Sequence, residues 1–312
     1  MSLHRLTQIT IGVPSVEETA AYYTEFGLVP QGVTPNGGHL FGTVDGGQQL
    51  QIVQRPKRQL VTLGIGVDDQ DDLDRLTSSL GRIEIDVKRT GGQRLSAIEP
   101  VTQTEVIVSV APRIVQEATP APNYNAPGIV GRPNHRAYWS ERTEAVHPRK
   151  LGHVVVGSPD LEASQRFFTD GLGFKISDTA PGLATFMRCS QDHHNLLLQA
   201  APVSFLHHTS WQVDDIDEIG RGAKTMLAEH PERHVWGLGR HWVGSNFFYY
   251  LRDPAGNFTE YYSDMDEIVD DQLWEPGVFE MSDFATIPDW GPPLPASLIA
   301  PDDLADLMAG SH

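Results

Sequence analysis

Apolar runs of strand type alternate along this chain with segments that have a helical period. Residues 5–30, RLTQITIGVPSVEETAAYYTEFGLVP, begin with a short β-branched run, pass Val13-Pro14 and continue as an amphipathic stretch that reaches Gly27. Strict alternation is typical of a strand, whereas an apolar face that recurs every three to four residues is typical of a helix. The segment therefore predicts a strand followed by a helix.

The same pattern begins four times. Residues 150–175 align with residues 5–30 without a gap, and residues 206–222 resemble residues 60–76, where a double Asp can cap a helix. In the third copy we expect Ser158 as N-cap and Pro159 at the first helical position. Alternating runs with turns fill the intervals, for example at Asp253–Gly256. Repetition at about 50 residues indicates four modules, each a strand, a helix and three strands, and hence an α+β fold.

One stretch interrupts the repetition. Residues 116–150 are rich in Pro, Gly, Asn and charge and have no apolar period, which is typical of a linker. We therefore expect an amino-terminal domain at 1–115, a linker at 116–150, a second domain at 151–270 and a tail at 271–312.

Charge and composition exclude several classes of partner. The chain has 41 acidic and 23 basic residues, a formal charge of -18, so we expect neither nucleic acid nor an anionic membrane surface to bind. No apolar run approaches the roughly 20 residues of a membrane helix, and the first residues do not resemble a signal peptide. The single cysteine, Cys189, excludes an internal disulfide and a multi-thiolate zinc site. We expect a cytoplasmic protein that assembles as a homo-oligomer.

Histidines are concentrated in the second half, where eight of the 13 lie between His153 and His241. His153 and His208 fall in the first strands of the third and fourth modules, and Glu260 falls in the last strand of the fourth. Equivalent positions of paired modules can meet in space. Two histidines and one carboxylate on one face of a metal leave open positions, as in non-haem Fe(II) oxygenases.

The motifs LGHVVVGSPDLE, LHHTSW and DPAGNFTEYY resemble those of the vicinal oxygen chelate superfamily, within it the two-domain type I extradiol ring-cleaving dioxygenases. The resemblance implies two domains, each an incomplete mixed β-barrel with helices outside. It implies His153, His208 and Glu260 as metal ligands. It also implies that His208 faces inward with Ser210 and Gln212, whereas His207 faces away with Thr209 and Trp211.

The resemblance further implies three catalytic residues. His194 acts as acid and base, with His193 as the alternative. His241 hydrogen-bonds the reacting oxygen, and Tyr250, next to Tyr249, orients the substrate. The implied substrates are a catechol and O2, and the implied metal is Fe(II), with Mn(II) possible; no other cofactor is expected.

The first half lacks the ligand set, since Gln8 and Thr62 stand where the second half has His153 and His208, and Val106, beside Glu105, aligns with Glu260. Three other functions stay open. A glyoxalase-like isomerase would need a second glutamate, a metal-free binding or resistance protein would not need the triad, and a zinc hydrolase would keep the triad without consuming oxygen.

Overall fold

The computed structural model describes residues 3–120, 123–280 and 288–309, and its central feature is a βαβββ unit that occurs four times. The first unit comprises β1 (Leu3–Val13), α1 (Val16–Glu25), β2 (Val29–Val33), β3 (His39–Thr43) and β4 (Gly47–Gln54). The second comprises β5 (Gln59–Val67), α2 (Gln70–Arg82), β6 (Lys88–Thr90), β7 (Arg94–Ile98) and β8 (Glu105–Val110). The third comprises β9 (Lys150–Ser158), α3 (Leu161–Arg166) with the π-helix η2 (Phe167–Gly171), β10 (Lys175–Ala180), β11 (Ala184–Arg188) and β12 (Leu196–Ala200). The fourth comprises β13 (Phe205–Gln212), α4 (Ile216–Leu227), η3 (Pro231–Arg233), β14 (His234–His241), β15 (Phe247–Arg252) and β16 (Phe258–Ser263).

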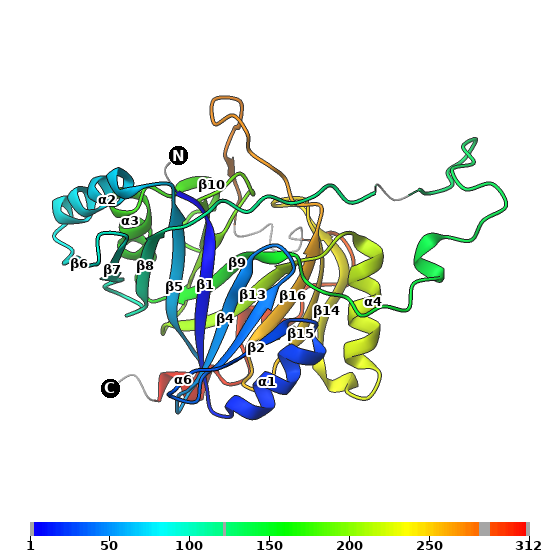
Figure 1. The fold of residues 1–312 in the computed structure, drawn as a ribbon, viewed down its shortest axis with the longest axis horizontal. Coiled ribbons are helices and arrows are strands. Elements are labelled where there is room, and N and C mark those ends of the chain that lie inside the picture. Colours follow the sequence, from blue (N-terminus) through cyan, green and yellow to red (C-terminus); the bar gives the residue numbers. More distant parts are fainter. Residues whose placement is uncertain (1–2, 121–122, 281–287, 310–312) are drawn as a thin grey trace.

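The units pair into two open, mixed sheets (Figure 1). The first has the strand order β2-β3-β4-β1-β5-β8-β7-β6, and the second contains β10-β11-β12-β9-β13-β16-β15-β14 in the same arrangement. In each sheet the first strands of two units are antiparallel neighbours at the centre, and each is parallel to the last strand of its own unit. The predicted α+β fold of four βαβββ modules is therefore confirmed.

Helix caps follow the sequence signals with one exception. The second Asp of each double-Asp pair is the N-cap, Asp69 for α2 and Asp215 for α4, and both side chains accept backbone N–H groups of the first turn. The expected cap at Ser158 is wrong because β9 continues through that residue. Asp160 instead caps α3 by accepting the N–H of Ala163, so the helix begins two residues later.

The two halves share one hydrophobic core that extends from β1 to β16. Helix α1 packs its buried aromatic face on the second sheet, where the ring of Phe26 stacks on Tyr261 with centroids 3.9 Å apart. Tyr23 contacts Trp211 at 6.4 Å between ring centroids. The first half, which lacks the candidate metal ligands, therefore packs against the strands of the second half that carry the histidines and the glutamate.

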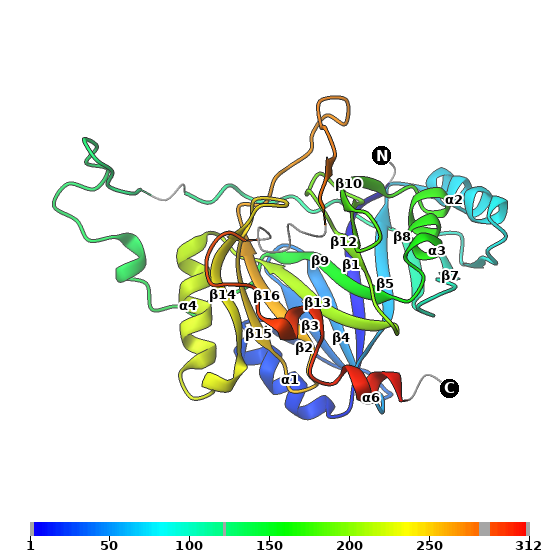
Figure 2. The same ribbon diagram turned by 180° about the vertical axis from the view of Figure 1, so that it is seen from behind.

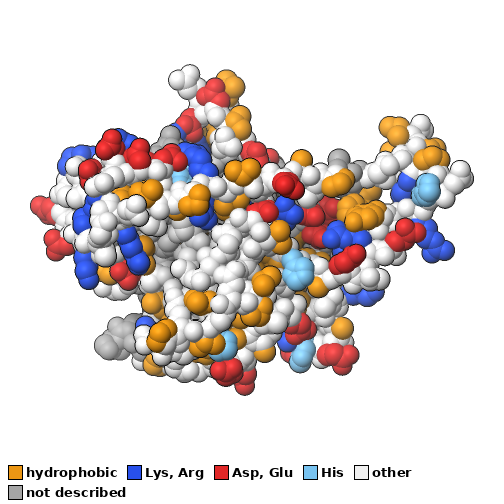
Figure 3. Space-filling model, viewed as in Figure 1, with side chains coloured by type: hydrophobic (Ala, Val, Ile, Leu, Met, Phe, Trp, Pro, Cys, Tyr) orange, Lys and Arg blue, Asp and Glu red, His pale blue; other side chains and the backbone are white. Residues whose placement is uncertain are grey.

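The segment between the halves projects away from both sheets (Figures 1 and 2). Of its described residues, only Tyr138–Ser140 form a helical turn, η1. Exposed apolar side chains gather on it, including Ile129 at 62% and Val130 at 71% exposure (Figure 3). Within the described part of the chain, no helix is both long and apolar enough to cross a membrane.

The carboxy-terminal tail returns to the second sheet. Its described elements are β17 (Gly277–Val278), β18 (Pro288–Trp290), α5 (Ala296–Ile299) and α6 (Leu304–Met308). β17 and β18 add to the two edges of the second sheet, and α5 lies over the face of that sheet (Figure 2). Residues 281–287 and 310–312 of the predicted tail lie outside the described residues.

Candidate metal centre and cavity

Three adjacent strands bring His153, His208 and Glu260 together. In the register of the sheet, Ser210 of β13 lies opposite His153 of β9 on one side and opposite Glu260 of β16 on the other. Nε2 of His153 lies 3.1 Å from Oε2 of Glu260 and 3.3 Å from Nε2 of His208, which is 3.7 Å from the same carboxylate oxygen. All three side chains are buried.

These distances suit one metal ion. With metal–ligand bonds of about 2.1 Å, ligand atoms at right angles lie about 3.0 Å apart, and those at a tetrahedral angle lie about 3.4 Å apart. Oε2 of Glu260 is fully buried and accepts no hydrogen bond from any described residue. An unsatisfied buried carboxylate oxygen is rare in folded proteins. A divalent cation between the three side chains would satisfy it.

The other oxygen of Glu260 is held by the protein. Asn246, buried in the loop before β15, donates from Nδ2 to Oε1 of Glu260 at 3.1 Å. Burial opposes ionisation of Glu260, but His153 and His241 outweigh it and hold the pKa of Glu260 well below its usual range. Sequence reasoning missed Asn246, because an Asn before an aromatic run carries no distinctive signal.

Two members of the triad, His153 and His208, line a cavity of about 440 Å³, and Glu260 lies fully buried beside them. Most of the cavity walls are apolar and come mainly from β9, β11, β12, β14 and the tail. The apolar and aromatic lining includes Val155, Phe186, Leu197, Trp236, Trp242, Phe279, Leu294 and Leu298. An apolar cavity of this size with a few polar groups at one end suits a small aromatic molecule.

His194 lines this cavity, whereas His193 lies behind it. The ring of His194 is 4.3 Å from that of His153 between centroids. Nδ1 of His194 contacts Nδ1 of His193 at 3.0 Å, and Nε2 of His193 donates to the carboxylate of Asp178 at 3.0 Å. Burial, with His153 and His193 adding to it, lowers the pKa of His194 well below its usual range. His194 is therefore a neutral imidazole that faces the cavity.

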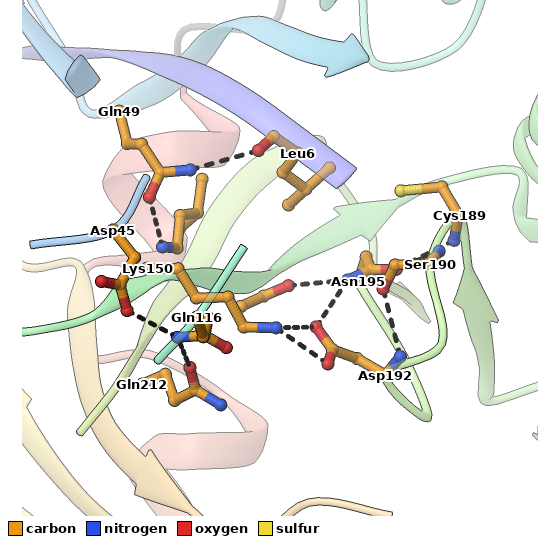
Figure 4. A network of polar contacts seen from close by, with 12 residues as sticks. Leu6, Asp45, Gln49, Gln116, Lys150, Cys189, Ser190, Asp192, Asn195 and Gln212 are labelled. Carbon is orange, nitrogen blue, oxygen red and sulfur yellow. Dashed lines mark hydrogen bonds and ion pairs between the residues drawn. The ribbon is translucent and has the colours of Figure 1, made fainter. Parts of the chain in front are cut away.

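Asn195 bridges two stretches of backbone through its side-chain amide (Figure 4). Its Nδ2 donates to the carbonyl of Gly152 at 3.0 Å, and its Oδ1 accepts the backbone N–H of Cys189 at 2.9 Å. The loop that carries His194 is thereby tied to the strand that carries His153.

His241 and Tyr250 form a second pair of polar side chains in the cavity wall, where the ring of Tyr250 is 5.1 Å from that of His208 between centroids. Nε2 of His241 lies 3.0 Å from the hydroxyl of Tyr250 and 3.7 Å from Oε1 of Glu260. Burial, reinforced by Glu260, raises the pKa of Tyr250 well above its usual range, so its phenol stays protonated. The neighbouring Tyr249 points elsewhere, with its hydroxyl 2.8 Å from Nδ1 of His234.

The prediction that His207 faces away from the site is wrong. The pairing of β13 with β9 shifts register between Leu206 and His208, so a β-bulge at His207 brings two consecutive side chains to the same side. His207 lines the cavity, and burial lowers its pKa to about 4. Thr209 and Trp211 do face the opposite side, where the indole of Trp211 donates to the hydroxyl of Thr209.

The first half holds no counterpart of the triad. Gly64 of β5 lies opposite Ile107 of β8, just as Ser210 of β13 lies opposite Glu260 of β16. The residue equivalent to Glu260 is therefore Ile107, one position after the predicted Val106. Among the described residues, only His153, His208 and Glu260 form a cluster of three or more potential metal ligands.

The residues around this centre match one family model, described as the Glyoxalase/Bleomycin resistance protein/Dioxygenase superfamily, over residues 150–261. Metapyrocatechase 2 of Cupriavidus necator is 37% identical over 156 residues, which are 49% of this chain and 48% of that protein. A 3-methylcatechol 2,3-dioxygenase of Pseudomonas putida is 25% identical over 68% of this chain and 73% of its own length. An iron-dependent extradiol dioxygenase of Rhodococcus jostii is 29% identical over 40% of this chain and 46% of its own. The match to the first of these relatives thus spans about half of that protein's length.

Two solved structures share the whole fold. The Mn(II)-bound glyoxalase from Novosphingobium aromaticivorans superposes with a TM-score of 0.74 at 24% identity, over 94% of each chain. BphC, a halotolerant catechol dioxygenase, superposes with a TM-score of 0.75 at 19% identity, over 95% of this chain and 96% of its own. At these identities the likeness shows the architecture alone.

Proposed function

We propose that this chain, whose residues 150–261 belong to the Glyoxalase/Bleomycin resistance protein/Dioxygenase superfamily, is an extradiol dioxygenase that opens a catechol ring beside its two hydroxyl groups. His153, His208 and Glu260 would hold the divalent metal, for which Fe(II) is the first choice and Mn(II) the second. The name of the Pseudomonas putida relative, 3-methylcatechol 2,3-dioxygenase, supports a catechol as the substrate class in this proposal.

One observation supports the proposal above the others. Two of the three potential metal ligands, His153 and His208, line an apolar cavity that His194, His241 and Tyr250 also line, close to the same centre. A hydrolase needs one water at the metal, whereas this arrangement leaves one face of the triad open to a flat apolar ring.

The side chains of the cavity have different roles in the proposed reaction. When bound, the metal supplies open coordination positions and acidifies the ring hydroxyls of the substrate. His194, neutral at pH 7, accepts the proton of one hydroxyl and returns it to the product. His241 and Tyr250 lie side by side and hydrogen-bond the oxygen atoms that gain charge during the reaction. The apolar walls hold the ring and exclude bulk water.

Oxygen consumption tests the proposal. Metal-free protein is loaded anaerobically with Fe(II), mixed with catechol, 3-methylcatechol or 2,3-dihydroxybiphenyl in air, and followed by an oxygen electrode and by the yellow absorbance of the ring-cleaved product. We expect uptake matched to colour, lost in Glu260→Gln and kept in Glu105→Gln, a glutamate of β8 in the ligand-free half.

The alternatives give different results. Conversion of a glutathione hemithioacetal of methylglyoxal without oxygen uptake would identify a glyoxalase-like isomerase, and ester or amide hydrolysis with Zn(II) would identify a hydrolase. A chain that binds no divalent metal would refute the triad. Homo-oligomeric assembly and a cytoplasmic location stay predictions.

A further inference from the structure

The carboxy-terminal tail contacts the metal centre through His207. Nε2 of His207 lies 2.6 Å from the backbone carbonyl oxygen of Leu298 in α5, and Nδ1 of His207 lies 2.7 Å from Nδ1 of His208. His207 is 3% exposed, and both of its ring nitrogens have a hydrogen-bond partner in the protein. A continuous hydrogen-bonded path therefore joins the tail backbone to a proposed metal ligand.

The chemistry of the groups fixes the direction of each bond in this path. A carbonyl oxygen can only accept, so Nε2 of His207 carries a proton and donates to Leu298. A neutral imidazole has one donor and one acceptor, so Nδ1 of His207 accepts from Nδ1–H of His208. Nε2 of His208 then keeps its lone pair, and it is this atom that faces Nε2 of His153 and Oε2 of Glu260.

His153 has no comparable support, because its Nδ1 finds no hydrogen-bond partner among the described residues. The two histidines of the triad thus differ. Outside the triad, the ring of His153 packs against the rings of His194 and Tyr262, whereas the ring of His208 has a hydrogen-bond partner, His207.

The tail is itself held in place by the ligand-free half. Arg58, whose side chain is 2% exposed, donates to both carboxylate oxygens of Asp303, at 2.6 Å from Nε and 2.8 Å from Nη2. Arg58 also donates to the backbone carbonyl of Leu206, next to His207. Nε1 of Trp236 donates to the carbonyl of Pro292 at 2.8 Å, which anchors the tail on the cavity wall.

We propose that His207 is a positioning residue that fixes the tautomer and ring orientation of His208, and that the tail, docked by Arg58 and Asp303, fixes His207 through the carbonyl of Leu298. The inference rests on the proposed metal site. A partner that holds the second nitrogen of a metal-ligating histidine typically raises metal affinity 10–100-fold.

Metal affinity tests the role of His207. Metal-free full-length protein is titrated with Mn(II), and free Mn(II) is measured by its electron paramagnetic resonance signal. His207→Phe keeps a ring and removes both hydrogen bonds, so we expect an affinity about 10–100-fold weaker. His207→Asn keeps an acceptor at the Nδ1 position and should restore most of the affinity. His147→Phe is the control, since His147 also bonds a backbone carbonyl, that of Gly27, outside the cavity, and should leave affinity unchanged.

A double-mutant cycle tests the tail. Asp303→Leu should weaken Mn(II) binding because it releases the tail from Arg58. In a chain that already carries His207→Phe, Asp303→Leu should cause little further loss of affinity, because both substitutions interrupt the same hydrogen-bonded path from the tail to His208. Additive losses would show that the tail acts on the metal site by another route and would overturn this part of the proposal.

Nitrogen-15 spectra of histidine-labelled, metal-free protein test the tautomer without metal and without a variant. We expect His208 protonated at Nδ1 in the native chain. Protonation at Nε2, or unchanged Mn(II) affinity in folded His207→Phe, would overturn the proposal. Failure of the native chain to bind Mn(II) at all would instead refute the metal site, while the tautomer measurement would still decide the role of His207.

Discussion

The clearest test of how the ligand-free half supports the site is Phe26→Ala. Phe26 follows α1, is fully buried, and stacks on Tyr261 with an interplanar angle of 2°. Tyr261 is adjacent to Glu260 in β16. On the same face, Tyr22 hydrogen-bonds Thr259 on the other side of the glutamate. The change therefore removes a contact between the two halves beside a proposed ligand.

The expected loss follows from burial. Replacing a fully buried Phe with Ala typically costs about 3–5 kcal/mol through lost transfer free energy and the cavity left behind. The aromatic pair contributes about 0.5–1.5 kcal/mol of that loss. Since whole domains are stable by about 5–15 kcal/mol, this single change would remove a large share of the free energy of unfolding.

Urea unfolding followed by tryptophan fluorescence measures the effect of the substitution on the stability of the second half. All six tryptophans follow residue 138, so their fluorescence reports the second half and the segment before it, whereas the mutation lies in the first. We expect the midpoint to fall and to coincide with that from far-UV circular dichroism. Tyr138→Ala, at a ring 63% exposed, is the control and should change the free energy by less than about 0.5 kcal/mol. A loss below about 1 kcal/mol, or a fluorescence transition that does not move, would refute the shared core.

Three further predictions concern the site. Asn246→Leu removes the hydrogen-bond donor to Oε1 of Glu260 and should weaken Mn(II) binding about 10-fold or more in the same titration. Unchanged Mn(II) affinity would show that Glu260 binds the metal equally well without this hydrogen bond. Tyr250→Phe should lower kcat/KM for catechol about 2- to 12-fold, the worth of one hydrogen bond, whereas Tyr249→Phe should leave it unchanged; equal effects would contradict the placement of the two rings. Burial lowers the pKa of His207 from 6.5 to about 4. As the pH falls, the unfolded chain therefore binds a proton at His207 before the folded chain does, which favours unfolding. The free energy of unfolding of the metal-free protein should fall by about 3 kcal/mol between pH 6.5 and pH 4. Urea titrations at both pH values check this, and a fall of the same size in His207→Asn would assign it to other groups.

The sequence by itself determined the repeated module and where the chemistry lies. A strand period of two and a helical period near 3.6 are local properties, so four βα starts could be recognised along the chain. The double-Asp caps at Asp69 and Asp215 and the turn at Asp253–Gly256 are local hydrogen-bond devices and are present as expected. Module positions showed that His153, His208 and Glu260 could meet, and the resemblance to the vicinal oxygen chelate superfamily implied that they form one ligand set.

Only the tertiary structure decided features that depend on register and on segments distant in sequence. The bulge at His207 arises from pairing between β13 and β9, and a shift of one residue changes which face a side chain occupies. The hydrogen bond from Asn246 to Glu260 and the docking of Asp303 on Arg58 join residues that no local pattern relates. The tail that closes the cavity has no strong period of its own, because its conformation is set by the surface on which it packs rather than by its own sequence.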